Sequence, residues 1–375
     1  MPERRAVVIG AAIGGLVATL ELARRGIPVT VVVRGSAPGG KLREVAINGQ
    51  RIDAGPPVFT LRYVFEDIFA AAGSSLAEEL SLTPLQTLAR HAWDADQRLD
   101  LHADLEQCAD AIGDFAGAAE ADSYRHFCSR AQGIYDTLEA PFIKGSRPNP
   151  LSLVARVAGN GLGGLARIQP FGSLWQALGR EFRDPRLQQL FGRYATYMGS
   201  SPFSAPATLM LIPHVERAGV WTVNGGMHQL ARTLEPLATA HGAVFRYDTE
   251  ARRVVARQSR VTVVKLAYEE LLTADMIIFN ADSAAVSSGK LGSEIRDAVL
   301  QQKPAQRSLS ALSWSLVAST KGFPLHHHTV FFSGDYARES EEILQQHRLP
   351  SSPTVYVCAQ DINDRKRIAQ GGFLG

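Results

Sequence analysis

The sequence has few cysteines, almost no net charge and no long apolar run. Its three cysteines, Cys108, Cys128 and Cys358, include no CxxC pair, which excludes a disulfide framework or a cysteine-based zinc site. The formal charge of +2, from 39 basic and 37 acidic side chains, gives no global field that would attract nucleic acid. No apolar run reaches the roughly 18 to 20 residues that span a bilayer. The first residues also lack the pattern of a secretory signal, so a reducing, cytoplasmic setting is expected.

The N-terminal region predicts a strand–helix–strand unit. A β-branched run at 6–9 precedes a glycine-rich turn at 10–15, helical spacing at 16–25 and a second strand at 29–33. With 375 residues and 45% hydrophobic content, the chain is long enough for two domains.

Downstream patterns predict a helical section between two α/β sections. Residues 47–59 form a hairpin pattern around Asn48-Gly49, a helix follows at 64–72, and helical periodicity dominates from 82 to 217. A helix at 227–241 and strands at 243–246, 252–256, 261–266 and 276–279 then return the chain to its first domain. Further strands are expected at 308–319, 329–333 and 354–359, with a helix at 336–347 between the last two.

The glycine-rich turn has the form of a dinucleotide-binding fingerprint. Gly10, Gly14 and Gly15 permit a tight turn, and the helix that begins near Ile13 can hold a pyrophosphate at its N-terminus. Ala12 replaces the second glycine of the usual pattern. At the end of the second strand, where an acid normally binds the ribose, the chain has Val33 followed by Arg34. An arginine there would also suit an NADP phosphate.

The segments that follow favour a flavin. Gly39-Gly40-Lys41 and Asp53-Ala54-Gly55-Pro56 resemble the flavoprotein amine oxidase and phytoene desaturase superfamily, although plain turn glycines would look similar. This resemblance implies FAD as the cofactor, contacted by the fingerprint and by Gly39, Gly40, Lys41, Gly55 and Pro56.

Later segments resemble bacterial carotenoid desaturases. Gly225-Gly226-Met227 opens a helix, and Ala274-Asp275 precedes a strand that ends in Asn280-Ala281-Asp282. The resemblance implies FAD contacts from Asn280 and Asp282. It also places the strand carrying Val254 and Val255 near the adenine side of the cofactor.

Three segments narrow the resemblance to the methoxyneurosporene dehydrogenase, or 1-hydroxycarotenoid 3,4-desaturase, branch. They are 182–197, 327–332 and 353–361. The implied fold is α/β: a Rossmann-like FAD-binding domain from 1–80 and 225–290, with an inserted α+β substrate domain from 81–224 and 291–375. Members of the family continue beyond the position equivalent to Gly375 with a glycine-rich segment that returns to the flavin, so a C-terminal truncation is expected.

Three alternatives to the desaturase stay open. A carotenoid isomerase uses the same fold with reduced flavin, and an amine oxidase shares the superfamily. The third is a non-enzymatic protein, either an inactive truncated remnant or a carotenoid-binding protein without bound flavin, which Ala12, Val33 and the end at Gly375 would suit. No catalytic acid or base can be assigned, because Glu21, Glu66, Glu341 and Glu342 all lie on expected helices, where carboxylates are usually solvated. The oligomeric state is likewise unassigned.

Two local features concern a metal and a membrane. His326, His327 and His328 suggest a metal site, but adjacent strand residues point to opposite faces, so no metal is predicted. Residues 140–180 combine basic and apolar side chains without an acid before Glu181, which suits a solvated face or an anionic membrane surface. A carotenoid substrate favours the second, so the protein is expected on the cytoplasmic side of the inner membrane, peripherally attached.

Overall fold

The computed structural model describes residues 4–145, 172–258, 260–301 and 308–362, which form two compact units. Unit 1 comprises Met1–Thr83, Thr222–Arg307 and Ser313–Val317, and unit 2 comprises Pro84–Trp221, Ser308–Leu312 and Ala318–Gly375. The sequence placed residues 291–307 in the other domain. In the structure η5 (Ser293–Ala298) packs with β10 (Ala251–Arg257) and α12 (Ala284–Ser287) of unit 1. Within the described residues, no helix is both long and apolar enough to cross a membrane.

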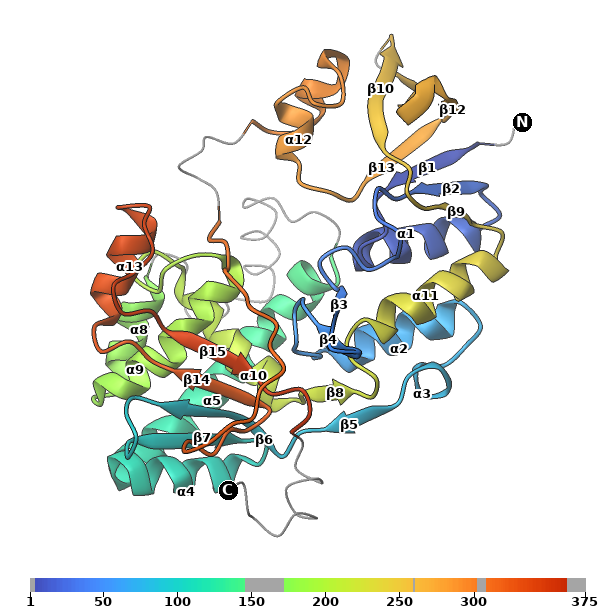
Figure 1. Ribbon diagram of the computed structural model, residues 1–375. Helices are drawn as coiled ribbons and strands as arrows, with labels where there is room; N and C mark the ends of the chain where they lie inside the picture. Colours follow the sequence, from blue (N-terminus) through green and yellow to red (C-terminus); the bar gives the residue numbers. More distant parts are fainter. Residues whose placement is uncertain (1–3, 146–171, 259, 302–307, 363–375) are drawn as a thin grey trace. The chain divides into compact units, whose positions relative to one another are not determined.

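A parallel four-stranded sheet forms the centre of unit 1. The strand order is β13 (Met276–Phe279), β1 (Ala6–Ile9), β2 (Val29–Val32) and β9 (Val244–Arg246). All four residues of β1 are buried, as expected for a central strand of a parallel sheet. Helix α1 (Ile13–Ala23) connects β1 to β2 and packs against α11 (Gln229–Ala240), as Figure 1 shows. The predicted strand–helix–strand unit and the return of the chain at 276–279 are confirmed.

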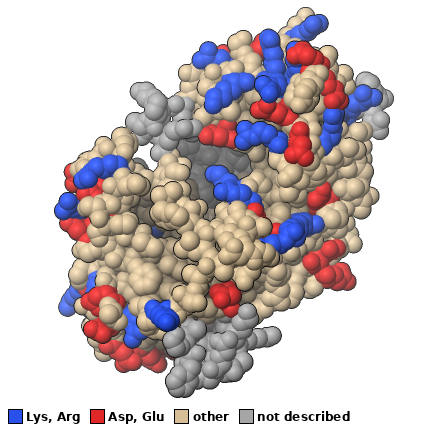
Figure 2. Space-filling model, viewed as in Figure 1, with Lys and Arg blue, Asp and Glu red and all other residues tan. Residues whose placement is uncertain are grey.

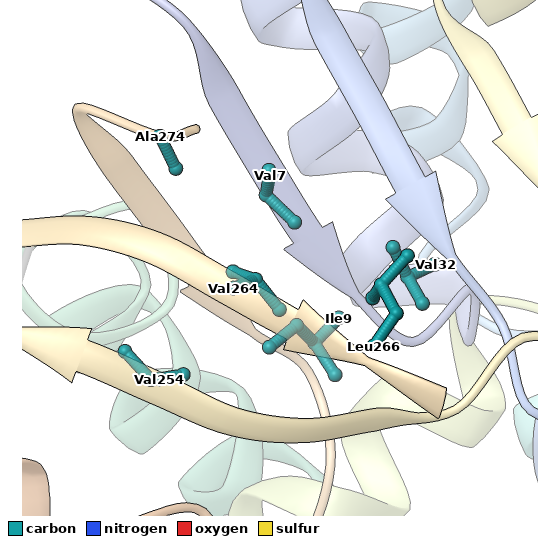
Figure 3. Close-up of a cluster of buried hydrophobic side chains, with 7 residues drawn as sticks. All are labelled: Val7, Ile9, Val32, Val254, Val264, Leu266 and Ala274. Atoms are coloured by element: carbon teal, nitrogen blue, oxygen red, sulfur yellow. The ribbon is translucent and has the colours of Figure 1, made fainter. Parts of the chain in front are cut away.

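An antiparallel sheet covers part of this first sheet. It consists of β10, β11 (Arg260–Leu266) and β12 (Leu271–Thr273). Figure 3 shows the core between them, in which Val7, Ile9 and Val32 of the parallel sheet meet Val254, Val264, Leu266 and Ala274. Burial of these aliphatic side chains stabilises the unit by about 1.5–3 kcal/mol for each Val, Leu or Ile.

The hairpin predicted around Asn48-Gly49 is confirmed and begins slightly earlier. Strands β3 (Glu44–Ile47) and β4 (Gln50–Asp53) pair across these two residues, whose φ angles of 49° and 77° are those of a tight hairpin turn. Helices α2 (Arg62–Ala71) and α3 (Leu76–Glu79) follow. The short strands β5 (Leu82–Pro84) and β8 (Trp221–Val223) lie where the chain passes from one unit to the other.

Helices make up much of unit 2, as the periodicity predicted. They are α4 (Leu105–Ala116), α5 (Ala118–Leu138), η1 (Glu139–Ile143), α8 (Leu174–Glu181), α9 (Pro185–Gly192), η2 (Arg193–Met198), η3 (Ala207–Met210) and α10 (Leu211–Arg217). Phe127, Phe182 and Phe191 are buried together, with ring centroids 4.7–5.2 Å apart. This aromatic cluster holds α5, α8 and α9 to one another.

A four-stranded sheet in unit 2 corrects two sequence predictions. Its order is β15 (Val355–Cys358), β14 (His328–Phe331), β6 (Thr87–Ala92) and β7 (Arg98–His102), and α13 (Tyr336–Leu344) follows β14. The sequence assigned 82–217 to helices and missed β6 and β7, because Arg90 and His91 interrupt the apolar alternation of β6. Conversely, the segment 308–319, where a strand was expected, forms neither a strand nor a helix.

Candidate flavin site

The turn between β1 and α1 is shaped by glycine. Gly10 has a φ of +100°, and a Cβ there would lie 2.7 Å from the carbonyl oxygen of Asn280. Its N–H donates to the carbonyl of Val32 at 2.9 Å. Ala12 precedes α1, and its side chain makes no capping bond. The first-turn amides of α1 therefore have no side-chain cap, as a helix that binds a phosphate group requires.

Asn280 lies against the two glycines that begin α1. A Cβ on Gly14 would be 2.9 Å from the side-chain Nδ2 of Asn280, and a Cβ on Gly15 would be 2.9 Å from the side-chain Oδ1 of Asn280. A Gly15 Cβ would also lie 2.1 Å from the carbonyl oxygen of Gly10. The buried Oδ1 of Asn280 has no hydrogen-bond partner among the described residues. This oxygen is an acceptor beside the glycine turn that a ligand can satisfy.

The Gly39–Gly40 turn packs directly on Ala12. Gly39 donates its N–H to the carbonyl of Ala11 at 2.7 Å and forms a bridge with Ala12. A Cβ on Gly40 would lie 2.8 Å from the Cβ of Ala12, so the methyl group that replaces the usual glycine fills space against this turn. Gly55 also lies close to this turn, because a Cβ there would be 2.0 Å from the carbonyl oxygen of Lys41. The side chains of Lys41 and Pro56 are exposed.

The sequence indicated Asp53 only as part of a motif, but in the structure its side chain connects the β3–β4 hairpin to the residues before α11. Its carboxylate accepts hydrogen bonds from the backbone amides of Met227, at 2.5 Å, and His228, at 3.2 Å. The Nε2 of His228 in turn lies 2.9 Å from the carbonyl oxygen of Pro38, next to the Gly39 turn. Asp53 and His228 thus tie the hairpin and the glycine turn to the start of α11.

Glu44 adds a charge network that the sequence analysis missed. It forms ion pairs with Arg51 and Arg232, each at 3.0 Å. Burial opposes its ionisation, but Arg51, Arg232 and His228 outweigh burial and hold the pKa of Glu44 below its usual value. The glycines at 225 and 226 were the available sequence signal, since they come just before the start of α11, where these groups meet.

The remaining predicted contacts are distributed over unit 1. Val33 is only 8% exposed, and its backbone bonds to residues 246 and 249, whereas Arg34 is exposed. Val254 is 2% exposed and belongs to the core of Figure 3. Asp282 is exposed and accepts from the amide of Ala284 at 2.9 Å. The structure therefore brings the fingerprint, the Gly39 turn and Asn280 together.

The histidine cluster differs from the expectation for a regular strand. His327 lies just before β14, so the strict alternation of strand faces does not apply to it. Ligand atoms of His327, His328 and Cys358 all lie within 4.8 Å of one another. The Nδ1 atoms are engaged, His327 with the carbonyl of Ile362 at 2.8 Å and His328 with the hydroxyl of Tyr356 at 2.6 Å. The absence of a metal stays a prediction.

The basic, apolar segment expected at a membrane falls mostly on 146–171, outside the described residues. Of its basic side chains, Lys144 forms an ion pair with Glu139 at 3.2 Å, and Arg180 lies in the last turn of α8. On the face drawn in Figure 2, acidic and basic side chains are intermixed over the described surface.

A family model described as flavin containing amine oxidoreductase matches residues 13–347, which include Gly14, Gly15 and most of both units. The chain belongs to this family. Its cofactor is FAD, and it is a flavin-dependent oxidoreductase. The residues present fit such a group, because the uncapped start of α1, the close glycines and the unsatisfied oxygen of Asn280 lie together.

Two curated relatives match nearly the whole chain. A hydroxyneurosporene desaturase of Rubrivivax gelatinosus is 50% identical over 361 residues, covering 96% of this chain and 69% of the relative. A second, of Cereibacter sphaeroides, is 42% identical and covers 95% of this chain and 72% of the relative. A solved Pyrococcus furiosus structure has a TM-score of 0.52 at 15% identity, covering 98% of this chain and 83% of its own. The structural likeness supports the fold alone.

Proposed function

We propose that this chain is a carotenoid desaturase that introduces the 3,4 double bond into hydroxy- or methoxy-carotenoids. The observation that carries the proposal is the 50% identity to a hydroxyneurosporene desaturase over 96% of the chain. A 1-hydroxycarotenoid 3,4-desaturase of Flavobacterium, 28% identical over 94% of the chain, supports the position of the new bond.

The reaction breaks one C–H bond on each of two adjacent carbons and forms the second bond between them. FAD, when bound, accepts one hydrogen as a hydride, and the other leaves as a proton. The amides at the start of α1 are suited to the pyrophosphate, and the Gly39–Gly40 turn, tied down by Asp53 and His228, is suited to lie along the cofactor. The protein positions an unactivated polyene and needs no nucleophile.

The mass of the product tests this proposal against the isomerase. The purified chain, loaded with FAD, is incubated with a 1-hydroxycarotenoid that lacks the 3,4 double bond, and the extracted pigment is analysed by mass spectrometry. A desaturase gives a product lighter by two hydrogens, whereas a product of unchanged mass would indicate isomerisation.

Flavin retention tests the alternative of an inactive remnant. The native chain is mixed with FAD, desalted and compared by its visible spectrum with a chain carrying Ala12→Gly and Val33→Glu. Because the Ala12 methyl is accommodated against Gly40, the native chain is expected to keep about one FAD per chain. Retention by the repaired chain alone would contradict the proposed activity of the native protein.

We further propose that the protein collects its substrate at the cytoplasmic face of the inner membrane. A carotenoid is insoluble in water, and the 140–180 segment has the composition of an interfacial segment. Flotation with vesicles of anionic lipid is expected to carry the protein upward, and failure to float with either anionic or neutral vesicles would contradict this proposal.

A further inference from the structure

The three segments that narrow the sequence resemblance converge on one side of the unit 2 sheet. In the strand register, Val330 of β14 lies opposite His91 of β6 and Tyr356 of β15, so these residues share a face. His328 lies two residues before Val330 and shares this face, and its Nδ1 is 2.6 Å from the Tyr356 hydroxyl. Two of the three segments, 327–332 and 353–361, thus supply neighbouring polar groups.

The third segment supplies a positive charge over the same face. The Nε of Arg193 donates to Nε2 of His91 at 3.3 Å, and its guanidinium carbon lies 4.6 Å from the centre of the Tyr194 ring. Burial and then Arg193 hold the pKa of His91 well below its usual value, so this histidine is neutral and accepts the bond. His91 and Tyr194 therefore fix the orientation of the guanidinium.

Arg193 is charged, yet it forms no ion pair with a carboxylate among the described residues. Burial opposes its charge, but Tyr194, Tyr197 and Glu216 outweigh burial and raise its pKa. Glu216 instead accepts hydrogen bonds from the hydroxyls of Tyr194, at 2.5 Å, and Tyr197, at 2.7 Å. A guanidinium carries five N–H donors, so Arg193, which bonds to His91 and Tyr197, retains donors for another oxygen.

His328 provides an unsatisfied polar atom beside this charge. The residue is 4% exposed, and its Nε2 has no hydrogen-bond partner among the described residues. Burial, His327 and Arg193 lower the pKa of His328 to about 3, so the ring is neutral. Tyr356 and Tyr197 are 44% and 49% exposed, so the group can be reached from solvent. A buried atom without a partner next to a half-buried cation is typical of a binding site rather than of a core.

We propose that Arg193, His328 and Tyr356 bind the hydroxyl or ether oxygen at the end of the carotenoid substrate. This inference rests on the proposed desaturase function and adds how the substrate is chosen. A long polyene offers few distinguishing features, and its oxygen is the group that a hydrogen-bonding site can recognise. Anchoring that oxygen fixes which carbon pair along the chain is presented for oxidation.

Paired substrates and variants test the site. Turnover and binding are measured with a 1-hydroxycarotenoid and with the same polyene lacking the hydroxyl. Arg193→Met and Tyr356→Phe are compared with Arg183→Met, a change at an exposed arginine of the same unit. Loss of a hydrogen bond to a charged group is expected to lower kcat/KM for the hydroxylated substrate about 10- to 100-fold. The hydrocarbon should change less than about threefold, because it makes no such bond.

Equal losses on both substrates would overturn the proposal, since they would indicate a purely structural role. If Arg193→Met fails to fold, Arg193→Lys, which keeps the positive charge, takes its place in the test. This variant is expected to lose part of the preference for the hydroxylated substrate over the hydrocarbon, because lysine lacks the planar guanidinium group. If the chain oxidises neither carotenoid, the proposed desaturase function fails, but quenching of tryptophan fluorescence still compares their binding. Equal affinity of the native chain for both would then overturn the oxygen site by itself.

Discussion

The carboxylate of Asp53 links two parts of unit 1 that the chain separates by more than 170 residues, and Asp53→Asn tests this link. The native carboxylate accepts from the amides of Met227 and His228 at the start of α11. Hydrogen bonds to a charged group contribute about 1.5–3 kcal/mol each, against about 1 kcal/mol for neutral ones. Asparagine keeps one acceptor and turns an NH₂ group toward the second amide, so a loss of about 2 kcal/mol is expected.

Release of FAD reports on this loss. Because the hairpin, His228 and the Gly39 turn are connected, about 2 kcal/mol corresponds to a dissociation constant up to about 30-fold weaker. Flavin fluorescence, which rises on release, is followed during titration with FAD and with denaturant. Asp67→Asn is the matched control, since Asp67 is exposed on α2 of the same unit. If Asp53→Asn holds FAD as firmly as this control, the proposed coupling is wrong.

Three further predictions concern the turn, the acid stability and the core. Gly15→Ala should abolish retention of FAD on desalting, because its Cβ would lie 2.1 Å from the Gly10 oxygen, whereas Gly133→Ala, with no atom within 4 Å of the added Cβ, should retain it. The pKa of His328 is lowered to about 3, so below pH 6.5 the unfolded chain binds more protons than the folded one. Acidification to pH 5 should therefore lower the free energy of unfolding by about 2 kcal/mol. The free energy of unfolding of His328→Gln should depend less on pH over the same range. Phe127→Ala should destabilise unit 2 by about 3–5 kcal/mol, measured as a shift in the denaturation midpoint, and an unchanged midpoint would contradict the packing described.

The sequence predicted those elements that are specified by the residues of a short segment alone. The strands at 6–9 and 276–279 have the predicted bounds, because short apolar runs beside glycine or polar residues leave little choice of register. The hairpin at Asn48-Gly49 followed from the positive φ that both residues tolerate. The family resemblance indicated that the fingerprint glycines and Asn280 belong to one cofactor site, and in the structure these residues lie close together. Their individual contacts with FAD stay predictions.

Long-range pairing decided what the sequence could not reveal. Strands β6 and β7 contain Arg90 and Asp100, which pair at 2.7 Å across neighbouring strands, so a charge that argued against a strand is neutralised within the sheet. In the same way, Arg193 meets His91 only because β6 pairs with β14 and η2 lies over that face. The sequence identified the segments of this site as distinctive, but only the fold brings their polar atoms together.

The central claim is that this flavoprotein removes two hydrogens from a carotenoid. The most direct measurement is an anaerobic single turnover of the FAD-loaded chain with a 1-hydroxycarotenoid, in which flavin absorbance and pigment mass are followed together. The account predicts that flavin bleaches by one equivalent for each carotenoid that becomes lighter by two hydrogens, with a shift of the pigment absorbance to longer wavelength. Unbleached flavin, or bleaching with a pigment of unchanged mass, would contradict it.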